Sequence, residues 1–146
     1  MGCDIHLFTE VRDADGKWEL FACDDPHRPG EQGYTDRCYA VFATLADVRN
    51  DREPIKPISK PRGWPEDMSD DLRALVNDET GRFRLRDVNE WPGDHSASYL
   101  TLAEILAHEW SRIEGYDYAA RFLAFCDELG KHGPPDDVRI VFNFDS

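Results

Sequence analysis

Basic residues are scarce in this 146-residue chain. It carries 17 Lys and Arg against 30 Asp and Glu, which gives a formal net charge of −13 at pH 7. This charge repels polyanions, so non-specific binding to DNA, RNA or an anionic lipid surface is disfavoured. The charge suits a cationic ligand, a basic protein surface or simple solubility. An acidic inhibitor that mimics DNA would also fit, provided that its carboxylates form an ordered array.

Several patterns that would name a compartment or a reaction are also missing. No apolar run reaches the length of a membrane span, and no secretory signal precedes the first predicted strand. HExxH, P-loop, GxGxxG, EF-hand and GxSxG patterns are absent, so the sequence names no reaction and a serine hydrolase is disfavoured. The four cysteines show no CxxC spacing, which argues against a zinc knuckle or a redox pair. We therefore expect reduced thiols and a cytosolic location.

The chain does contain enough apolar material for one domain, residues 1–146. Hydrophobic residues make up 40% of it and aromatic residues 12%. A chain of this length buries roughly two-thirds of its unfolded surface when it folds. The clearest local pattern is a strand over residues 3–12, where two sets of residues alternate at period two. One face of this strand carries Ile5, Leu7, Thr9 and Val11, and the other carries Asp4, His6, Phe8 and Glu10.

Further elements follow from turn, capping and periodicity signals. Asp-Gly at 15–16 predicts a hairpin turn with a returning strand over 17–23. Thr101 and Glu104 form a capping box that begins a helix. Prolines interrupt residues 51–68 repeatedly, which predicts a long irregular loop. The remaining predictions are helices over 36–49, 70–77, 101–113 and 118–129, an edge strand over 83–88, a loop over 91–98 and a last strand over 138–144. These elements predict an α+β fold with a small, mainly antiparallel sheet that includes both terminal strands and has helices packed on one face.

The first candidate site is the polar face of the first strand. Asp4 and His6 point the same way, and a carboxylate with an imidazole suits a divalent transition metal such as zinc, manganese or iron. Glu10 lies some 13 Å further along, at about 3.3 Å per residue, so it is a catalytic or outer candidate rather than a ligand of the same ion. The alternative interpretation is a solvated outer strand face.

The second candidate is the Asp94-His95-Ser96 segment before the capped helix. His95 could complete the metal site or act as a general acid or base near neutral pH. Loops at helix N-termini hold binding groups, which makes Ser96 a candidate ligand-binding residue. The alternative interpretation is an exposed loop histidine, or one that caps Ser96 and the helix behind it.

The third candidate is the polar face of the last strand. It carries Arg139, Asn143 and Asp145, and it would align with Asp4 and His6 if the two terminal strands are neighbours. The alternative is a solvent face with a weak Arg–Asp pair. Together the three candidates predict a metal set and a larger ligand-binding set. The metal set is Asp4, His6, His95 and Asp145, and the ligand-binding set adds Ser96, Arg139 and Asn143.

The opening Met-Gly-Cys-Asp-Ile-His resembles the start of a group of small uncharacterised proteins of bacteriophages and some bacteria. Residues 39–50, 61–65, 94–104 and 141–145 are similar to segments of the same group. The resemblance carries no established activity and no functional residues. It implies expression in a bacterial cytoplasm and an accessory role, such as acting on a host factor or countering host defence.

Three hypotheses remain. The first is a non-enzymatic module that sequesters a small charged ligand or a host protein. In this hypothesis the 51–68 loop acts as a lid. Trp64 and Trp91 are candidates to line a groove for a planar ligand, and the favoured alternative is that they pack their loops onto the core. The second is a metal-dependent hydrolase or nucleotide-processing enzyme with His95 or Glu10 as its catalytic group. The third is the acidic DNA mimic. The missing catalytic motifs favour the first.

Overall fold

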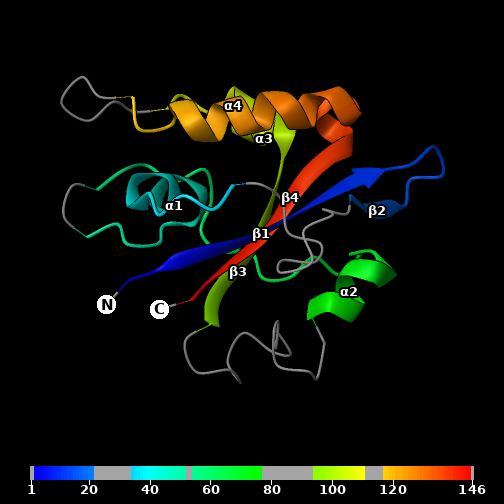
Figure 1. The fold of residues 1–146 in the computed structure, drawn as a ribbon, viewed down its shortest axis with the longest axis horizontal. Coiled ribbons are helices and arrows are strands. Elements are labelled where there is room, and N and C mark those ends of the chain that lie inside the picture. The colour runs from blue at the N-terminus through cyan, green and yellow to red at the C-terminus, as the bar shows by residue number, and fades with distance from the viewer. Residues whose placement is uncertain (1, 22–33, 52–53, 77–93, 111–116, 146) are drawn as a thin grey trace.

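The computed structural model describes residues 2–21, 34–51, 54–76, 94–110 and 117–145. Its centre is an antiparallel four-stranded sheet in the order β2-β1-β4-β3 (Figure 1). The strands are β1 (Asp4–Arg12), β2 (Trp18–Phe21), β3 (Asp94–Thr101) and β4 (Val138–Asp145). The α+β prediction is confirmed, and so is the prediction that the first and last strands are neighbours.

The hairpin from β1 to β2 is closed by an acidic side chain. Asp13 Oδ1 accepts hydrogen bonds from the backbone N–H of Asp15 and of Lys17, both at 2.9 Å. Gly16 has a φ of 81°, which suits glycine at the end of this turn. Beyond the turn, β1 pairs along its whole length with β4, from Asp4 opposite Asp145 to Val11 opposite Val138. This register aligns the polar residues of the two terminal strands.

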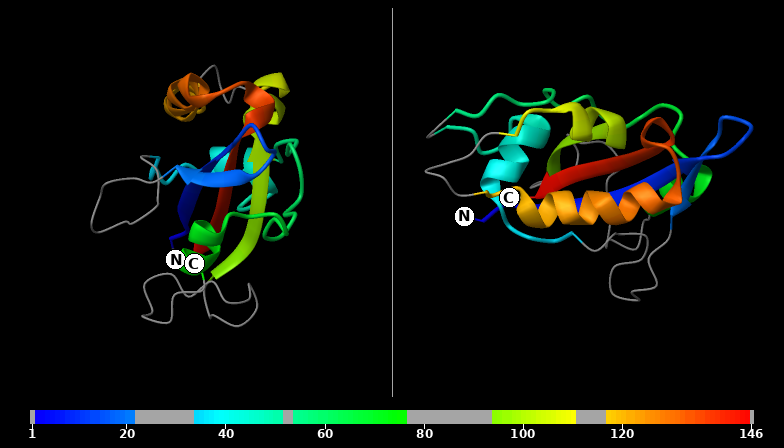
Figure 2. Two further views of the ribbon diagram at one scale, coloured as in Figure 1. Left: turned by 90° about the vertical axis from the view of Figure 1, so that its right-hand side faces the viewer. Right: turned by 90° about the horizontal axis from the view of Figure 1, so that it is seen from above.

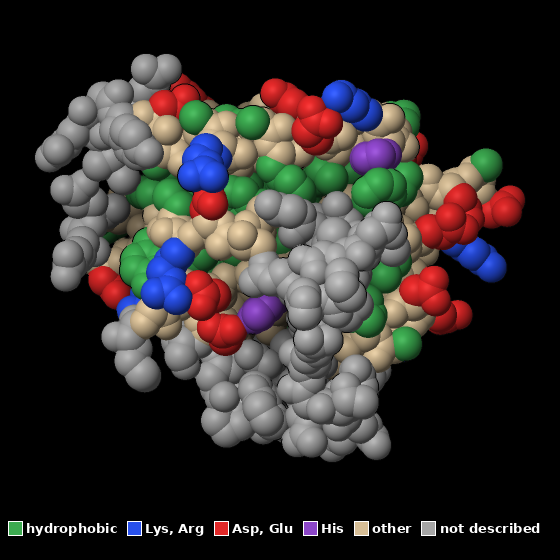
Figure 3. All heavy atoms as spheres, in the orientation of Figure 1, with side chains coloured by type: hydrophobic (Ala, Val, Ile, Leu, Met, Phe, Trp, Pro, Cys, Tyr) green, Lys and Arg blue, Asp and Glu red, His purple; other side chains and the backbone are tan. Residues whose placement is uncertain are grey.

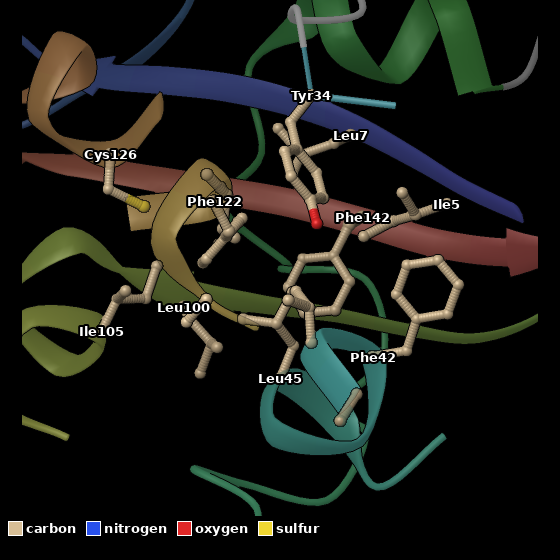
Figure 4. Packing of buried hydrophobic residues seen from close by; sticks show 14 of the residues in the cluster. Ile5, Leu7, Tyr34, Phe42, Leu45, Leu100, Ile105, Phe122, Cys126 and Phe142 are labelled. Atoms are coloured by element: carbon tan, nitrogen blue, oxygen red, sulfur yellow. The ribbon is translucent and has the colours of Figure 1, made fainter. Parts of the chain in front are cut away.

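Three helices cover one face of the sheet: α1 (Tyr39–Ala46), α3 (Leu102–Ala107) and α4 (Ala120–Leu129). Figure 2 shows α4 lying across the strands, and Figure 4 shows the side chains packed beneath the helices. The core includes Ile5 and Leu7 of β1 and alternate residues of β4, as the period-two pattern predicts. Two short 3-10 turns, Gly130–His132 and Pro135–Asp137, lead from α4 into β4.

The predicted capping box is present at the start of α3. The Thr101 hydroxyl accepts from the Glu104 N–H at 3.2 Å, and the Glu104 carboxylate accepts from the Thr101 N–H at 3.1 Å. The helix itself ends at Ala107, earlier than the predicted residue 113, and residues 111–116 lie outside the described ranges.

The opposite face of the sheet also carries a helix, so the prediction that the helices pack on one face describes only part of the fold. Helix α2 (Asp70–Val76) packs there over a second, smaller core. This core combines side chains from the two terminal strands with others from α2 and the segment before it. Its buried members are Phe8, Met68, Leu72, Val76 and Val141.

Strand β3 corrects the sequence analysis, which predicted a loop over residues 91–98. Asp94 to Thr101 pairs with β4, with an irregularity between His95 and Ser98. Ser96 has a φ of 58°, the left-handed conformation that lets a strand bulge. Polar, small residues carry little strand propensity, so this strand exists because β4 offers it an edge. The predicted strand over 83–88 lies outside the described residues, as does Trp91.

Residues 54–69, here called the strap, follow an ordered path around the β3 edge. Ile55 and Ile58 pack against the larger core, while Trp64 and Met68 reach the smaller one. Between them the Gly63 N–H donates to the Ala97 carbonyl at 2.8 Å. The prolines rule out helix, as predicted, but the strap is packed along its length and protects the edge strand. Its contacts with both cores do not favour its use as a free lid.

No helix in the described part of the chain is long and apolar enough to cross a membrane.

Candidate functional site

The pairing of β1 with β4 gathers polar side chains at the end of the sheet where both strands meet their termini. Asp4 lies opposite Asp145, and His6 lies opposite Asn143. Opposed residues in antiparallel strands share a face, so these four side chains form one patch. Together with Arg37, which binds Asp4, we call them the terminal-strand cluster. On the face turned toward the viewer in Figure 3, a histidine lies beside acidic side chains, with Lys or Arg next to them.

His6 and Asp145 form the tightest contact in the cluster. His6 Nε2 lies 2.6 Å from Asp145 Oδ2, and the two side chains are 22% and 40% exposed. The pair runs diagonally between the strands, because Asp145 is the register partner of Asp4 rather than of His6. A carboxylate at this distance fixes the orientation of the imidazole ring.

Arg37 is held over the start of β1 by Asp4. Its Nε and Nη2 donate to the two carboxylate oxygens of Asp4, both at 2.9 Å. These hydrogen bonds and the charge of Asp4 raise the pKa of Arg37. The guanidinium crosses the backbone at Gly2, where a Cβ atom would lie only 2.3 Å from Arg37 Nη1. Glycine at position 2 therefore makes room for the Arg37–Asp4 pair.

Asn143 forms the buried floor of the cluster. It is 1% exposed, and within the described residues its Oδ1 has no hydrogen-bond partner. A buried acceptor without a donor costs roughly 1–3 kcal/mol. The position of Asn143 in the sheet is therefore not optimised for stability alone.

A cavity of about 370 Å³ lies on the helical side of the sheet and shares Arg37 with the cluster, whose strand residues face the other side. It lies between residues 34–38, which lead into α1, and the first turn of α4. Figure 2 shows these two segments and both chain termini at the same end of the long axis. The lining residues are Tyr34, Asp36, Arg37, Cys38, Asp117, Tyr118, Ala120 and Arg121.

Two buried tyrosines form the inner wall of this cavity. The Tyr34 ring packs edge-on against Phe122, with centroids 5.0 Å apart, and Figure 4 shows it beside Leu7. Burial, followed by the nearby Cys38 and Asp36, raises the pKa of Tyr34, so its hydroxyl stays protonated near neutral pH. The Tyr118 hydroxyl lies 3.0 Å from the Thr44 hydroxyl. Both rings are thus fixed by packing or hydrogen bonding.

The predicted site residues His95 and Ser96 do not join the cluster. His95 lies opposite Phe144, a member of the larger core, and their ring centroids are 6.1 Å apart. His95 therefore faces the helical layer, whereas His6 and Asp145 face the other side. Its Nδ1 lies 2.9 Å from the Ser96 hydroxyl, as the capping alternative proposed. Burial and the positive charge of Arg49 lower the pKa of His95.

Glu10 and Arg139 are also separate from the cluster, at the other end of the two strands. Arg139 Nε donates to Glu10 Oε1 at 2.9 Å, and Glu10 Oε2 accepts from the Ser69 N–H at 2.7 Å. Arg139 also donates to Asp67, and its guanidinium lies 4.1 Å from the centre of a Trp18 ring. Both partners are buried, so the solvated-face interpretation is wrong for them. Glu10 is engaged in a structural ion pair, which does not favour it as a catalytic group.

The metal set predicted from the sequence does not converge in the described ranges. No three His, Cys, Asp or Glu side chains there lie in an arrangement that could hold a metal ion. The reason is the β3 register, which turns His95 away from Asp4, His6 and Asp145.

Sequence reasoning found four of the five cluster residues and missed Arg37. The one sequence feature connected with Arg37 was Gly2, and a glycine can occur at a position for many other reasons. The cavity was missed entirely, because its two walls are about 80 residues apart in the chain. Comparisons of the chain with protein-family models, curated proteins and solved structures find no match.

Proposed function

We propose that this protein is a binding module for a small charged ligand, held at the terminal-strand cluster and the cavity beside it. The observation that carries the proposal is the position of Arg37. Its guanidinium is fixed by two hydrogen bonds that it donates to Asp4, and at the same time Arg37 forms part of the cavity wall. A preformed cavity with a few fixed polar groups is the usual form of a small-molecule site.

The geometry gives less support to a metal-dependent hydrolase. Neither candidate catalytic residue belongs to the cluster or to the cavity wall: His95 packs beside Phe144, and Glu10 lies in a buried ion pair. In the phage-type setting that the sequence resemblance implies, a module of this kind would act by sequestering its ligand. A host protein or a basic protein bound by DNA mimicry is a different class of partner and would not need the cavity.

The test is a binding screen followed by nuclear magnetic resonance on 15N-labelled protein. The probes are inorganic phosphate, acetate, methylguanidinium and glycine, which cover both charges and a zwitterion. We expect at least one probe to shift the amide signals of Asp4, Arg37 and Tyr118 in the wild type. Arg37→Gln should weaken this response at least fivefold.

The matched control is Lys131→Gln, which removes one positive charge from an exposed ion pair with Glu128 at the far end of α4. It should leave the response unchanged. A response that persists in Arg37→Gln, or no response to any probe, would contradict the proposed site.

A further inference from the structure

The cavity beside the cluster has a balanced set of charges at its rim. Two carboxylates, Asp36 and Asp117, and two guanidinium groups, Arg37 and Arg121, line it. Their formal charges cancel, in a chain whose net charge is −13. A simple anion would meet two carboxylates there and a simple cation would meet two arginines. A ligand with separated charges of both signs avoids both conflicts.

The arginines are not equivalent. Asp4 accepts from Nε and Nη2 along one edge of the Arg37 guanidinium, so Arg37 acts as a fixed wall. Arg121 is 83% exposed and, among the described residues, forms one ion pair, with Asp36 at 3.1 Å. Exposed ion pairs of this kind contribute little, so a ligand carboxylate can replace Asp36 at small cost. Arg121 is therefore the group to receive a ligand anion, which releases the Asp36 carboxylate for a ligand cation.

The second acid, Asp117, lies at the other side of this rim. Its Oδ1 accepts from the Ala119 N–H at 3.2 Å, which fixes the carboxylate just before α4. Asp36 and Asp117 thus approach the cavity from its two walls, and an ammonium group between them would have acceptors from both.

The inner wall is aromatic and its size suits a small molecule. Tyr34 is 5% and Tyr118 7% exposed, so a ligand meets only the parts of these rings that border the cavity, and Phe122 supports Tyr34 from within the core. Aromatic walls bind planar apolar groups by stacked or edge-to-face contact. The volume of about 370 Å³ is at the lower end of the roughly 300–1,000 Å³ typical of small-molecule pockets.

We infer that the ligand of this cavity is a zwitterion with an aromatic group, of the class of aromatic α-amino acids. Its carboxylate pairs with Arg121, its ammonium group lies between Asp36 and Asp117, and its ring packs against Tyr34 and Tyr118. This inference rests on the proposed function, because it names the ligand class of the same site.

The test compares four probes by isothermal titration calorimetry on the full chain. L-Phenylalanine carries both charges and a ring, phenethylamine lacks the carboxylate, hydrocinnamate lacks the ammonium group, and glycine lacks the ring. We expect L-phenylalanine to bind at least tenfold more tightly than each of the other three. Equal binding of either singly charged analogue, or no measurable binding of L-phenylalanine, would overturn the inference.

Two substitutions separate the charges. Arg121→Gln should weaken the binding of L-phenylalanine and hydrocinnamate but should not weaken that of phenethylamine. Asp117→Asn keeps an acceptor for Ala119, so the protein should fold, and it should weaken L-phenylalanine and phenethylamine but leave hydrocinnamate unchanged. The opposite pattern, or equal losses for all probes, would overturn the assignment.

The two proposals fail in different ways. If a singly charged probe binds best and is lost in Arg37→Gln, the zwitterion inference fails while the proposed function stands. If no probe in either panel perturbs Asp4, Arg37 or Tyr118, both fail.

Discussion

The buried ion pair between Glu10 and Arg139 offers the sharpest test of how the sheet is held together. Glu10 is 0% exposed and Arg139 is 3% exposed. Replacing Glu10 with Gln removes the negative charge but keeps an acceptor for the Ser69 N–H. The guanidinium would then remain buried with less compensation for its charge. Removing one partner of a buried pair destabilises a protein by about 3–5 kcal/mol.

Two contacts place Glu10→Gln at the lower end of that range. Asp67 stays 2.9 Å from Arg139 Nη1, and the Trp18 ring stays 4.1 Å from the guanidinium carbon. We therefore expect a loss of about 3 kcal/mol in the free energy of unfolding. Small proteins have a total of about 5–15 kcal/mol, so this loss is large but leaves the protein folded if its stability is typical.

Urea unfolding followed by circular dichroism measures the loss. With a slope of about 1–3 kcal/mol per molar, the midpoint should fall by about 1–3 M. Asp67→Asn is the control, because the Asp67 side chain is 67% exposed and its pair should contribute at most about 1 kcal/mol. Glu10→Leu combined with Arg139→Met should be at least as stable as Glu10→Gln, since no buried charge is left unpaired. A loss below about 1 kcal/mol for Glu10→Gln would show that Arg139 does not depend on Glu10.

Two further predictions concern pH. The hydrogen bond and charge of Arg62 hold the pKa of Glu104 below its usual range, so this pair stabilises the fold above roughly pH 4 and the contribution is lost as the pH falls. Glu104→Gln should cost no more than about 1 kcal/mol at pH 7, because the pair is a third exposed, and less at pH 3. An equal loss in the free energy of urea unfolding at the two pH values would contradict this. Burial and then Arg49 depress the pKa of His95, so stability should fall as the pH drops below the unfolded value of about 6.5. Arg49→Gln should raise the pKa of His95 in an NMR titration without restoring its ordinary value, and an unchanged titration would show that Arg49 exerts no effect.

The sequence predicted the parts of the fold that depend on local patterns. Period-two alternation placed Ile5 and Leu7 in the core, and the Thr101–Glu104 capping box located the start of α3. It could not predict β3, because small polar residues signal a loop and only the free edge of β4 makes them a strand. The path of the strap is also non-local: it depends on a β3 backbone that local patterns did not indicate.

The candidate site divides in the same way. Asp4, His6, Asn143 and Asp145 could be grouped in advance because two strand patterns and one pairing are enough to align them. Arg37 could not, since a long side chain that crosses the backbone leaves no periodic signal. His95 was misplaced for a related reason: a loop residue has no assigned face, whereas a strand residue does.

The polar face of β1 thus has a different role at each end, and the segments that pack over each end determine that role. Asp4, His6 and Glu10 alternate identically in the sequence, and each has a polar partner on β4 or across the register. At the Glu10 end, the strap brings Asp67 and Ser69 over the ion pair, which is then closed from water and serves stability. At the Asp4 end, Arg37 lies across the polar groups and borders a cavity instead. The same alternating pattern therefore leads to a buried ion pair at one end of the sheet and, in our proposal, to part of a ligand site at the other.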